Sequence, residues 1–219
     1  MRVIWGGTFD PVHNGHIELA HQLVNTLGLD ELYLMPCYKA VHKVNVSASP
    51  SQRLQMLVMA TKKYPKLRID DREIKKQCAS YTYESLCDIR QEIGREPLSF
   101  VMGTDALINF PSWYRAKNLH KLTNIIIVQR PDCSIDSVEN FDKLVDDSVR
   151  ELNEIGFSLV DEHHSLTRYE SGKCLKLKLT EINVSSSHIR DLVKQHKKIT
   201  HLVDSEVNHF ISMHNLYLK

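Results

Sequence analysis

The stretch at residues 6–16, GGTFDPVHNGH, constrains the fold more than any other part of the chain. The mainly apolar residues 2–5 before it are typical of a buried strand that stops at a pair of glycines. Residues 17–27 after it repeat apolar side chains at helical spacing, and Gly28 is suited to end such a helix. The sequence therefore predicts a strand, a loop at residues 6–16 and a helix.

This loop has the features of a phosphate-binding site. The first N–H groups of a helix have no partner within the helix, and the helix dipole adds partial positive charge there. Glycines let a ligand approach the backbone closely, and His13 and His16 lie three residues apart where the helix is expected to begin. The stretch has neither the GxxxxGK[ST] pattern of a P-loop nor the GxGxxG pattern of a dinucleotide-binding turn. We therefore expect a phosphate-binding loop of a different kind.

Length and composition narrow the class of protein. With 219 residues, 42% of them apolar, the chain is expected to form a single domain over residues 1–219, with a helical C-terminal part over residues 185–219. A net charge of +1 gives no reason to expect a nucleic-acid partner. No secretory leader is visible and the apolar runs are short, so we expect no membrane partner and a cytoplasmic location. A homo-oligomer is left open.

The rest of the chain alternates between strand and helix patterns. A strand at residues 31–36 completes a strand–helix–strand unit, whose crossover implies parallel strands. Further strands are expected at residues 67–70, 98–102, 124–129, 157–160 and 175–182, and further helices at residues 80–93, 138–155 and 203–216. The predicted fold class is α/β, with a Rossmann-like doubly wound, mostly parallel sheet and helices on both faces.

A second helix is marked by its start. Ser49 as cap, Pro50 in the first position and Gln52 three residues after the cap are typical of a helix N-terminus. The inner face of this helix is predicted to carry Leu54, Leu57, Val58 and Thr61. Residues 73–79 and 162–174 are interpreted as polar connections.

A second strand-to-helix junction is predicted at residues 183–190, NVSSSHIR. Serines there can cap a helix start and also donate to phosphate oxygens. Two such junctions in one parallel sheet can point their helix N-termini at the same crevice. They bring donors and positive charge but no nucleophile, apart from Asp10 within the first loop. This set suits transfer between phosphates, which depends mainly on positioning and charge stabilisation.

The sequence patterns resemble those of a known family. GGTFDPVHNGH is similar to the signature of the nucleotidylyltransferases with an HxGH motif, and in this longer form to bacterial nicotinate-nucleotide adenylyltransferases. VSSSHIR at residues 184–190 resembles the second motif of that family, I-S-[ST]-[ST]-x-I-R. SYT at residues 80–82, GTD at 103–105 and FPSWY at 110–114 follow in the order and spacing of the family. The resemblance covers most of the chain.

The resemblance implies transfer of AMP from ATP to nicotinate mononucleotide, which gives deamido-NAD and pyrophosphate. It implies Mg²⁺ bound together with ATP, and it assigns no side chain as a metal ligand. The implied catalytic residues are His13, His16 and Arg190. The implied ATP-binding residues are Gly7, Thr8, Phe9, Gly103, Asp105, Ser186, Ser187, His42 and Lys43. The residues implied to bind nicotinate mononucleotide are Tyr81, Thr82, Tyr83, Trp113 and Tyr114.

The chain departs from the family pattern before the basic pair His42 and Lys43, where Ala40 and Val41 replace the usual prolines. A loop without prolines is expected to be more flexible. Two alternative functions are kept, and the altered loop bears on the second of them. One is adenylyl transfer to another phosphate acceptor, such as nicotinamide mononucleotide or phosphopantetheine. The other is nucleotide binding by a catalytically reduced relative.

Overall fold

The computed structural model describes residues 1–40, 46–128, 150–180 and 182–218. Two of the predicted phosphate-binding residues, His42 and Lys43, lie outside this part of the chain, as does most of the helix predicted at residues 138–155.

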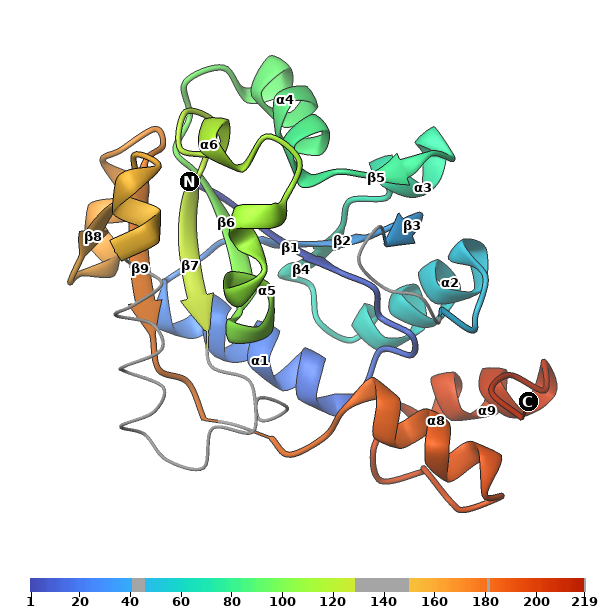
Figure 1. Cartoon of the computed structure of the whole chain (residues 1–219). Helices are drawn as coiled ribbons and strands as arrows, with labels where there is room; N and C mark the ends of the chain where they lie inside the picture. The colour runs from blue at the N-terminus through green and yellow to red at the C-terminus, as the bar shows by residue number, and fades with distance from the viewer. Residues whose placement is uncertain (41–45, 129–149, 181, 219) are drawn as a thin grey trace.

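A seven-stranded sheet forms the centre of the structure, in the order β4-β2-β1-β6-β7-β9-β8 (Figure 1). Its strands are β1 (Arg2–Gly7), β2 (Leu32–Pro36), β4 (Leu67–Ile69), β6 (Leu98–Gly103), β7 (Asn124–Val128), β8 (Ser158–Val160) and β9 (Lys173–Leu177). Every strand pairing among the described residues of this sheet is parallel. A second, two-stranded parallel sheet joins β3 (Lys39–Ala40) to β5 (Ala79–Ser80).

Helices cover both faces of the sheet (Figure 1). The helices are α1 (Asn14–Thr26), α2 (Pro50–Thr61), α3 (Arg72–Lys76), α4 (Thr82–Ile93), α5 (Thr104–Ile108), α6 (Ala116–Leu119), α8 (Ser186–Lys194) and α9 (Ser205–Met213), with 3₁₀ turns η1 (Phe110–Ser112) and η2 (His163–Thr167). Alternate residues of a strand enter different cores, because successive side chains point to opposite faces. Val3 and Trp5 pack with α1, α2 and α9, whereas Ile4 packs with α4 and α5.

Several local predictions are confirmed. Ser49 caps α2 and forms a reciprocal capping box with Gln52. Gly28 and Gly94 follow α1 and α4 with φ of +60° and +59°, a conformation that glycine adopts without a Cβ penalty.

The predicted inner face of α2 is confirmed for Leu57 and Thr61 and wrong for Val58. Its buried residues are Arg53, Met56, Leu57, Ala60 and Thr61. Val58, which was expected to be buried, is 51% exposed. The prediction missed Arg53 because it followed mainly the apolar residues, whereas the buried face of α2 includes this charged one.

The predicted polar connections also contain regular structure. Residues 73–79 include most of α3 and the start of β5, and residues 162–174 include η2 and the start of β9. These elements are too short to display a periodic pattern. Contacts from other parts of the chain hold α3 in place, because the buried Glu73 carboxylate accepts a 2.6 Å hydrogen bond from Ser85 Oγ of α4.

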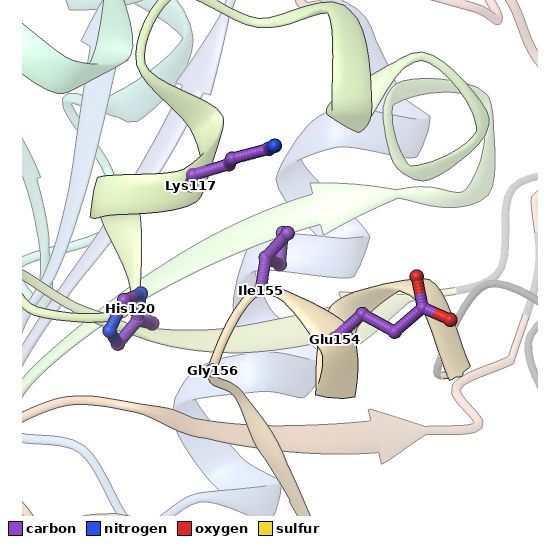
Figure 2. Close-up of a pocket in the computed structure, with 5 residues that line it drawn as sticks. All are labelled: Lys117, His120, Glu154, Ile155 and Gly156. Atoms are coloured by element: carbon purple, nitrogen blue, oxygen red, sulfur yellow. The ribbon is translucent and has the colours of Figure 1, made fainter.

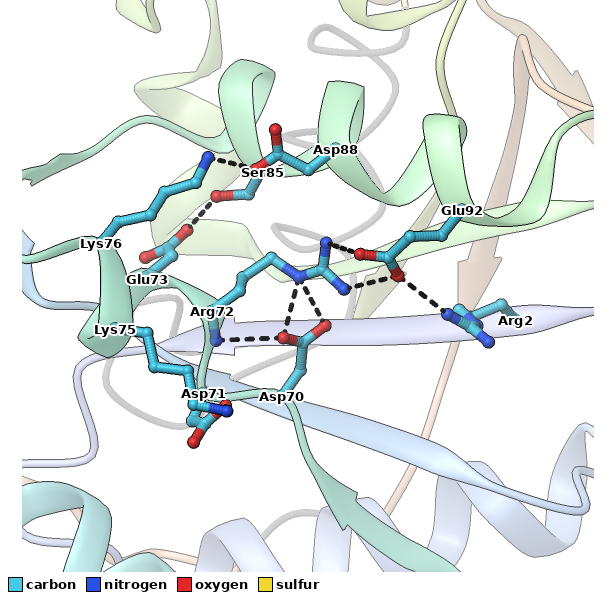
Figure 3. Close-up of polar contacts among 10 residues, drawn as sticks. All are labelled: Arg2, Asp70, Asp71, Arg72, Glu73, Lys75, Lys76, Ser85, Asp88 and Glu92. Atoms are coloured by element: carbon cyan, nitrogen blue, oxygen red, sulfur yellow. Dashed lines mark hydrogen bonds and ion pairs between the residues drawn. The ribbon is translucent and has the colours of Figure 1, made fainter.

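Arg72 connects α3 to the end of β4 and to α4 (Figure 3). Its Nε lies 2.8 Å from both carboxylate oxygens of Asp70, and its two Nη atoms lie 2.9 and 3.0 Å from those of Glu92. Burial opposes the charge of Arg72, but the hydrogen bonds to Glu92 and Asp70 outweigh it and raise the pKa of the guanidinium.

We expect the substitution Arg72→Met to lower the free energy of unfolding by about 1–3 kcal/mol, because it leaves the largely buried Asp70 carboxylate without its partner. Urea denaturation measures the change. Arg95→Met is the control, since the Arg95–Glu170 pair is exposed and is worth less than about 1 kcal/mol. Equal changes in the two variants would contradict the role given to Arg72.

Candidate active site

The candidate site lies where the strand order of the sheet reverses. β1 is flanked by β2 on one side and by β6 on the other, so the chain leaves the two neighbouring strands β1 and β6 in opposite directions. Ligands of open α/β sheets bind at the carboxyl ends of strands at such a point. Gly7 ends β1 and Gly103 ends β6, and Asp105 lies exposed in the first turn of α5. Two of the predicted motifs therefore meet at one edge of the sheet.

His13 and His16 form the N-terminus of α1. Nδ1 of His13 accepts a hydrogen bond from the His16 N–H, and Nδ1 of His16 accepts one from the His13 N–H, both at 3.3 Å. This is a capping box built from two imidazoles in place of the usual serine and glutamate. The two rings lie against one another, with their centroids 3.7 Å apart.

The capping bonds also determine the tautomers of the two rings. A neutral imidazole has one donor and one acceptor nitrogen. Because both Nδ1 atoms accept backbone N–H groups, each neutral ring must carry its proton on Nε2. His13 and His16 can therefore each present an N–H donor at the helix N-terminus, where an anion is already favoured.

Gly7 of the motif is needed for packing within the chain itself. A Cβ on Gly7 would lie 2.8 Å from the ring of Phe9, which folds back over it with φ of +50°. The Phe9 ring is buried and packs edge-on against Trp5 and His16. Gly7 thus makes room for the Phe9 ring, which packs edge-on against the His16 ring.

The second predicted junction contacts the first. Ser185 caps α8 by accepting from the His188 N–H. Ser186 Oγ donates to the Pro11 carbonyl at 2.9 Å, and Arg190 Nη1 donates to the Asp10 carbonyl at 2.7 Å. Arg190 Nη2 also donates to Ser187 Oγ at 3.2 Å. The structure therefore brings the start of α8 against the loop that carries the two histidines.

Asp10 holds this loop from the other side. Its carboxylate accepts from the N–H groups of Ser47 and Ala48, at 2.8 and 3.1 Å, and from the Tyr217 hydroxyl at 2.8 Å. Burial, together with the Asp10 carboxylate, raises the pKa of Tyr217, so its hydroxyl stays a donor. Asp10, which the sequence left as the one acidic residue of the loop, is a structural anchor for residues far apart in the chain.

The residues predicted to bind the acceptor gather beside α4. Tyr114 packs against Tyr81 with ring centroids 4.9 Å apart and edge-on against Tyr83 at 6.1 Å. The Arg115 guanidinium lies over the rings of Tyr83 and Tyr114. Trp113 is half-buried and packs against Phe100 and Phe110, so part of its ring belongs to the core. Arg115 was not among the predicted site residues.

Sequence comparison assigns the chain to a family. The family model described as cytidylyltransferase-like matches residues 4–192. A probable nicotinate-nucleotide adenylyltransferase of Hahella chejuensis (strain KCTC 2396) is 37% identical over 221 residues, which cover 98% of this chain and 94% of the relative. A protein of the same name from Legionella pneumophila (strain Lens) is 34% identical over 214 residues, which cover 98% and 97%. This chain belongs to the nicotinate-nucleotide adenylyltransferase family.

Solved structures support the predicted fold. The Plasmodium falciparum nicotinic acid mononucleotide adenylyltransferase complexed with NaAD superimposes with a TM-score of 0.73 at 18% identity, over 98% of this chain and 96% of that one. The same enzyme complexed with APC gives 0.69 at 16% identity. The Rossmann-like α/β class and the nucleotidyltransferase class predicted for this family member are both confirmed.

The protein also has a pocket of about 450 Å³ (Figure 2). The lining residues precede β7 and β8, so the pocket lies near the amino-terminal ends of the strands and not at the carboxyl ends that carry the motifs. It is lined by Lys117, His120, Glu154, Ile155 and Gly156. Gly156, with φ of +102°, is needed there because a Cβ would lie 2.7 Å from the His120 ring. The lining mixes both signs of charge and lies away from the motifs, so we assign it no part in the family reaction.

Two features are absent from the part of the chain that the structure describes. In that part of the chain no helix is long and apolar enough to cross a membrane. Within the same residues, histidine, cysteine and acidic side chains form no group of three that could hold a metal ion.

Proposed function

We propose that this protein transfers the AMP part of ATP to nicotinate mononucleotide, forming deamido-NAD and pyrophosphate. The observation that carries the proposal is the contact between the two junctions, in which Ser186 and Arg190 of α8 bind the loop that ends in His13 and His16. This arrangement places imidazole, hydroxyl and guanidinium donors around one helix N-terminus. The relatives named nicotinate-nucleotide adenylyltransferase align along almost the whole chain, which supports the same substrate pair.

The reaction needs no covalent intermediate with the protein. An oxygen of the mononucleotide 5′-phosphate attacks the α-phosphorus of ATP and forms a new P–O bond. The bond from the α-phosphorus to the oxygen that bridges it to the β-phosphorus breaks, and that oxygen leaves on pyrophosphate. Nε2–H of His13 and His16 would donate to the α-phosphate oxygens, where charge rises in the transition state. Arg190 and the Ser187 hydroxyl would hold the departing β- and γ-phosphates, and Ser186 would contribute its backbone N–H, because its hydroxyl already donates to Pro11.

The nucleoside part of ATP is proposed to lie along the carboxyl ends of β1 and β6. Gly7, Thr8 and Phe9 would line this cleft, and Gly103 would let the ligand approach the end of β6. The exposed Asp105 carboxylate in the first turn of α5 is proposed to accept from the ribose hydroxyls. His42 and Lys43, which belong to the basic segment after β3, are proposed to contact the phosphates.

The acceptor is proposed to bind at the start of α4. Tyr81, the cap residue of this helix, makes no hydrogen bond from its side chain to the helix N-terminus in the described structure. The N–H groups of Thr82 and Tyr83 are therefore proposed to bind the nicotinate carboxylate, since helix N-termini favour anions. Trp113 and Tyr114 would stack on and flank the pyridine ring. A carboxylate gains more from this helix end than a neutral amide does, which favours nicotinate over nicotinamide.

Mg²⁺ is proposed to arrive with ATP and to be held by phosphate oxygens and water, as is usual for this ion. Asp10, the one acidic residue of the motif, is poorly suited to bind a metal ion, because both of its carboxylate oxygens already accept hydrogen bonds. When bound, the ion would neutralise charge on the triphosphate. We further propose that residues 1–219 act as one domain in the cytoplasm, without a nucleic-acid partner. A homo-oligomer is compatible with this proposal.

Pyrophosphate release with Mg-ATP and a panel of acceptors tests the function. We expect release with nicotinate mononucleotide and weaker release with nicotinamide mononucleotide, because only the acid carries the carboxylate that α4 can bind. Phosphopantetheine is the control for a general phosphate acceptor. A preference for the amide would contradict the role of α4, and ATP binding without release from any acceptor would favour a reduced, nucleotide-binding relative.

A further inference from the structure

Arg53 is a fully buried cation beneath the candidate site, with a relative exposure of 0%. Its Nη1 donates to the Thr8 carbonyl at 2.7 Å, and its Nη2 donates to the carbonyls of Cys37 and Tyr38 at 2.7 and 2.9 Å. The acceptors are three backbone carbonyls just beyond the carboxyl ends of β1 and β2. A buried charge is costly, so its retention requires well-placed partners. The Arg53 guanidinium finds such partners on two loops at once, because Nη1 and Nη2 donate to carbonyls of different loops.

The hydrogen bonds continue from Arg53 to the acceptor side. The Tyr38 carbonyl accepts from Arg53, while the Tyr38 N–H donates to Ser80 Oγ at 2.9 Å. The residues after Tyr38 then pair with β5, with Lys39 opposite Ala79. The peptide unit that joins Cys37 to Tyr38 is thus held from both sides, because its carbonyl accepts from Arg53 and its N–H donates to Ser80. The chain of contacts runs from Thr8, in the loop at residues 6–16, to Ser80 beside Tyr81.

Glu73 secures the far end of this chain. Its carboxylate is buried, accepts from Ser85 Oγ of α4 at 2.6 Å and is also hydrogen-bonded to Ser80. Burial raises the pKa of Glu73, and these two hydrogen bonds oppose that effect. The first turn of α4 and the Ser80 side chain are therefore both fixed by a group that cannot move into solvent.

We propose that Arg53 is a positioning residue that sets the separation between the ATP half-site at Thr8 and the acceptor half-site at Tyr81–Tyr83. The proposal rests on the proposed function, because it assumes that two substrates bind to these two loops. In-line transfer requires the attacking phosphate oxygen and the α-phosphorus to be held at near-contact distance, and small displacements of either substrate are costly. A planar fork with several donors can hold both loops, whereas an ammonium group cannot reproduce that geometry.

Arg53→Lys keeps the positive charge and removes only the planar guanidinium that donates to both loops. We expect kcat to fall by about 10- to 100-fold, with a much smaller change in the affinity for ATP alone, because each half-site stays intact while their separation relaxes. Arg68→Lys is the matched control, since Arg68 is an exposed residue of the edge strand β4 and pairs with Glu31, outside the motifs. Activity is compared well below the melting temperature, so that only folded protein is measured. A wild-type kcat in folded Arg53→Lys would overturn the proposal.

Ser80→Ala removes the hydrogen bonds of the Ser80 hydroxyl with Tyr38 and Glu73 but keeps Arg53, and it serves if Arg53→Lys folds poorly. For Ser80→Ala we expect a lower kcat and faster hydrogen exchange of the Tyr38 amide. In the double variant Arg53→Lys/Ser80→Ala, the loss of kcat should be smaller than the product of the two single losses, because both residues act on the Cys37–Tyr38 peptide unit. Independent, multiplicative effects on kcat would count against the connection. The amide exchange needs no substrate, so it separates the two hypotheses: a wild-type protein inactive with nicotinate mononucleotide would refute the function, and unchanged Tyr38 exchange in both variants would refute the connection.

Discussion

Replacing His16 by glutamine is expected to lower kcat by about 10²- to 10³-fold, the usual loss when one preorganised donor to a developing oxyanion is removed. The free energy of unfolding should change by less than about 1 kcal/mol, because glutamine at this position can keep the capping bond. Gln52 makes the equivalent bond to Ser49 at the start of α2. Steady-state kinetics and urea denaturation of the same preparation measure the two quantities.

His21→Gln is the control for this substitution. His21 lies on the same helix, α1, but is exposed and away from the motif loop. We expect both activity and stability of this variant to match the wild type. Near-normal turnover of His16→Gln would remove the basis for giving the His16 imidazole a role in the transfer.

Replacing Asp10 by alanine is expected to lower the free energy of unfolding by about 3–5 kcal/mol, because a buried charged acceptor is lost while its donors remain. The N–H groups of Ser47 and Ala48 and the Tyr217 hydroxyl would lose their partner. The motif loop would also lose its anchor, so we expect kcat to fall in the protein that still folds. Urea denaturation with an unchanged m-value reports the loss of stability.

Asp30→Ala supplies the control, since Asp30 is exposed and such surface changes usually stay within about 0.5 kcal/mol. Tyr217→Phe removes one donor of the Asp10 cluster without removing the carboxylate. The double variant Asp10→Ala/Tyr217→Phe should be less destabilised than the sum of the single variants by about 0.5–3 kcal/mol, because the two residues share a hydrogen bond. Strict additivity would show that the Tyr217–Asp10 contact carries no energy.

The strands and longer helices could be predicted because each has a local signature. The run of apolar residues in β7 and the capping box of Ser49 and Gln52 are visible in the sequence as they stand in the structure. The short elements could not be predicted, since α3 and β5 have too few residues to show a period. They are held instead by contacts such as that of Glu73 with Ser85. The burial of Arg53 could have been predicted from its position, because residues 53, 56, 57, 60 and 61 share one helical face. Counting only apolar residues leaves it out.

The candidate site divides in the same way. The motifs at residues 6–16 and 184–190 could be found as residue patterns, because the chemistry of phosphate binding needs particular side chains at a helix start. The anchors of these motifs could not be found, because Asp10 meets Tyr217 across 207 positions and Arg53 meets Thr8 across 45. No local pattern reports such a pairing. The roles assigned to the individual site residues stay predictions.

The residue pattern alone established the order of the longer strands and helices, the parallel crossover and the resemblance of the two motifs to one family. Only the folded chain shows that His13 and His16 cap α1 with each other's N–H groups, which places both donor protons on Nε2. The folded chain also shows that Ser186 and Arg190 of α8 donate hydrogen bonds to the loop at residues 6–16. The physical reason is that periodicity and capping depend on neighbouring residues, whereas the direction of a side-chain donor depends on every segment that packs around it.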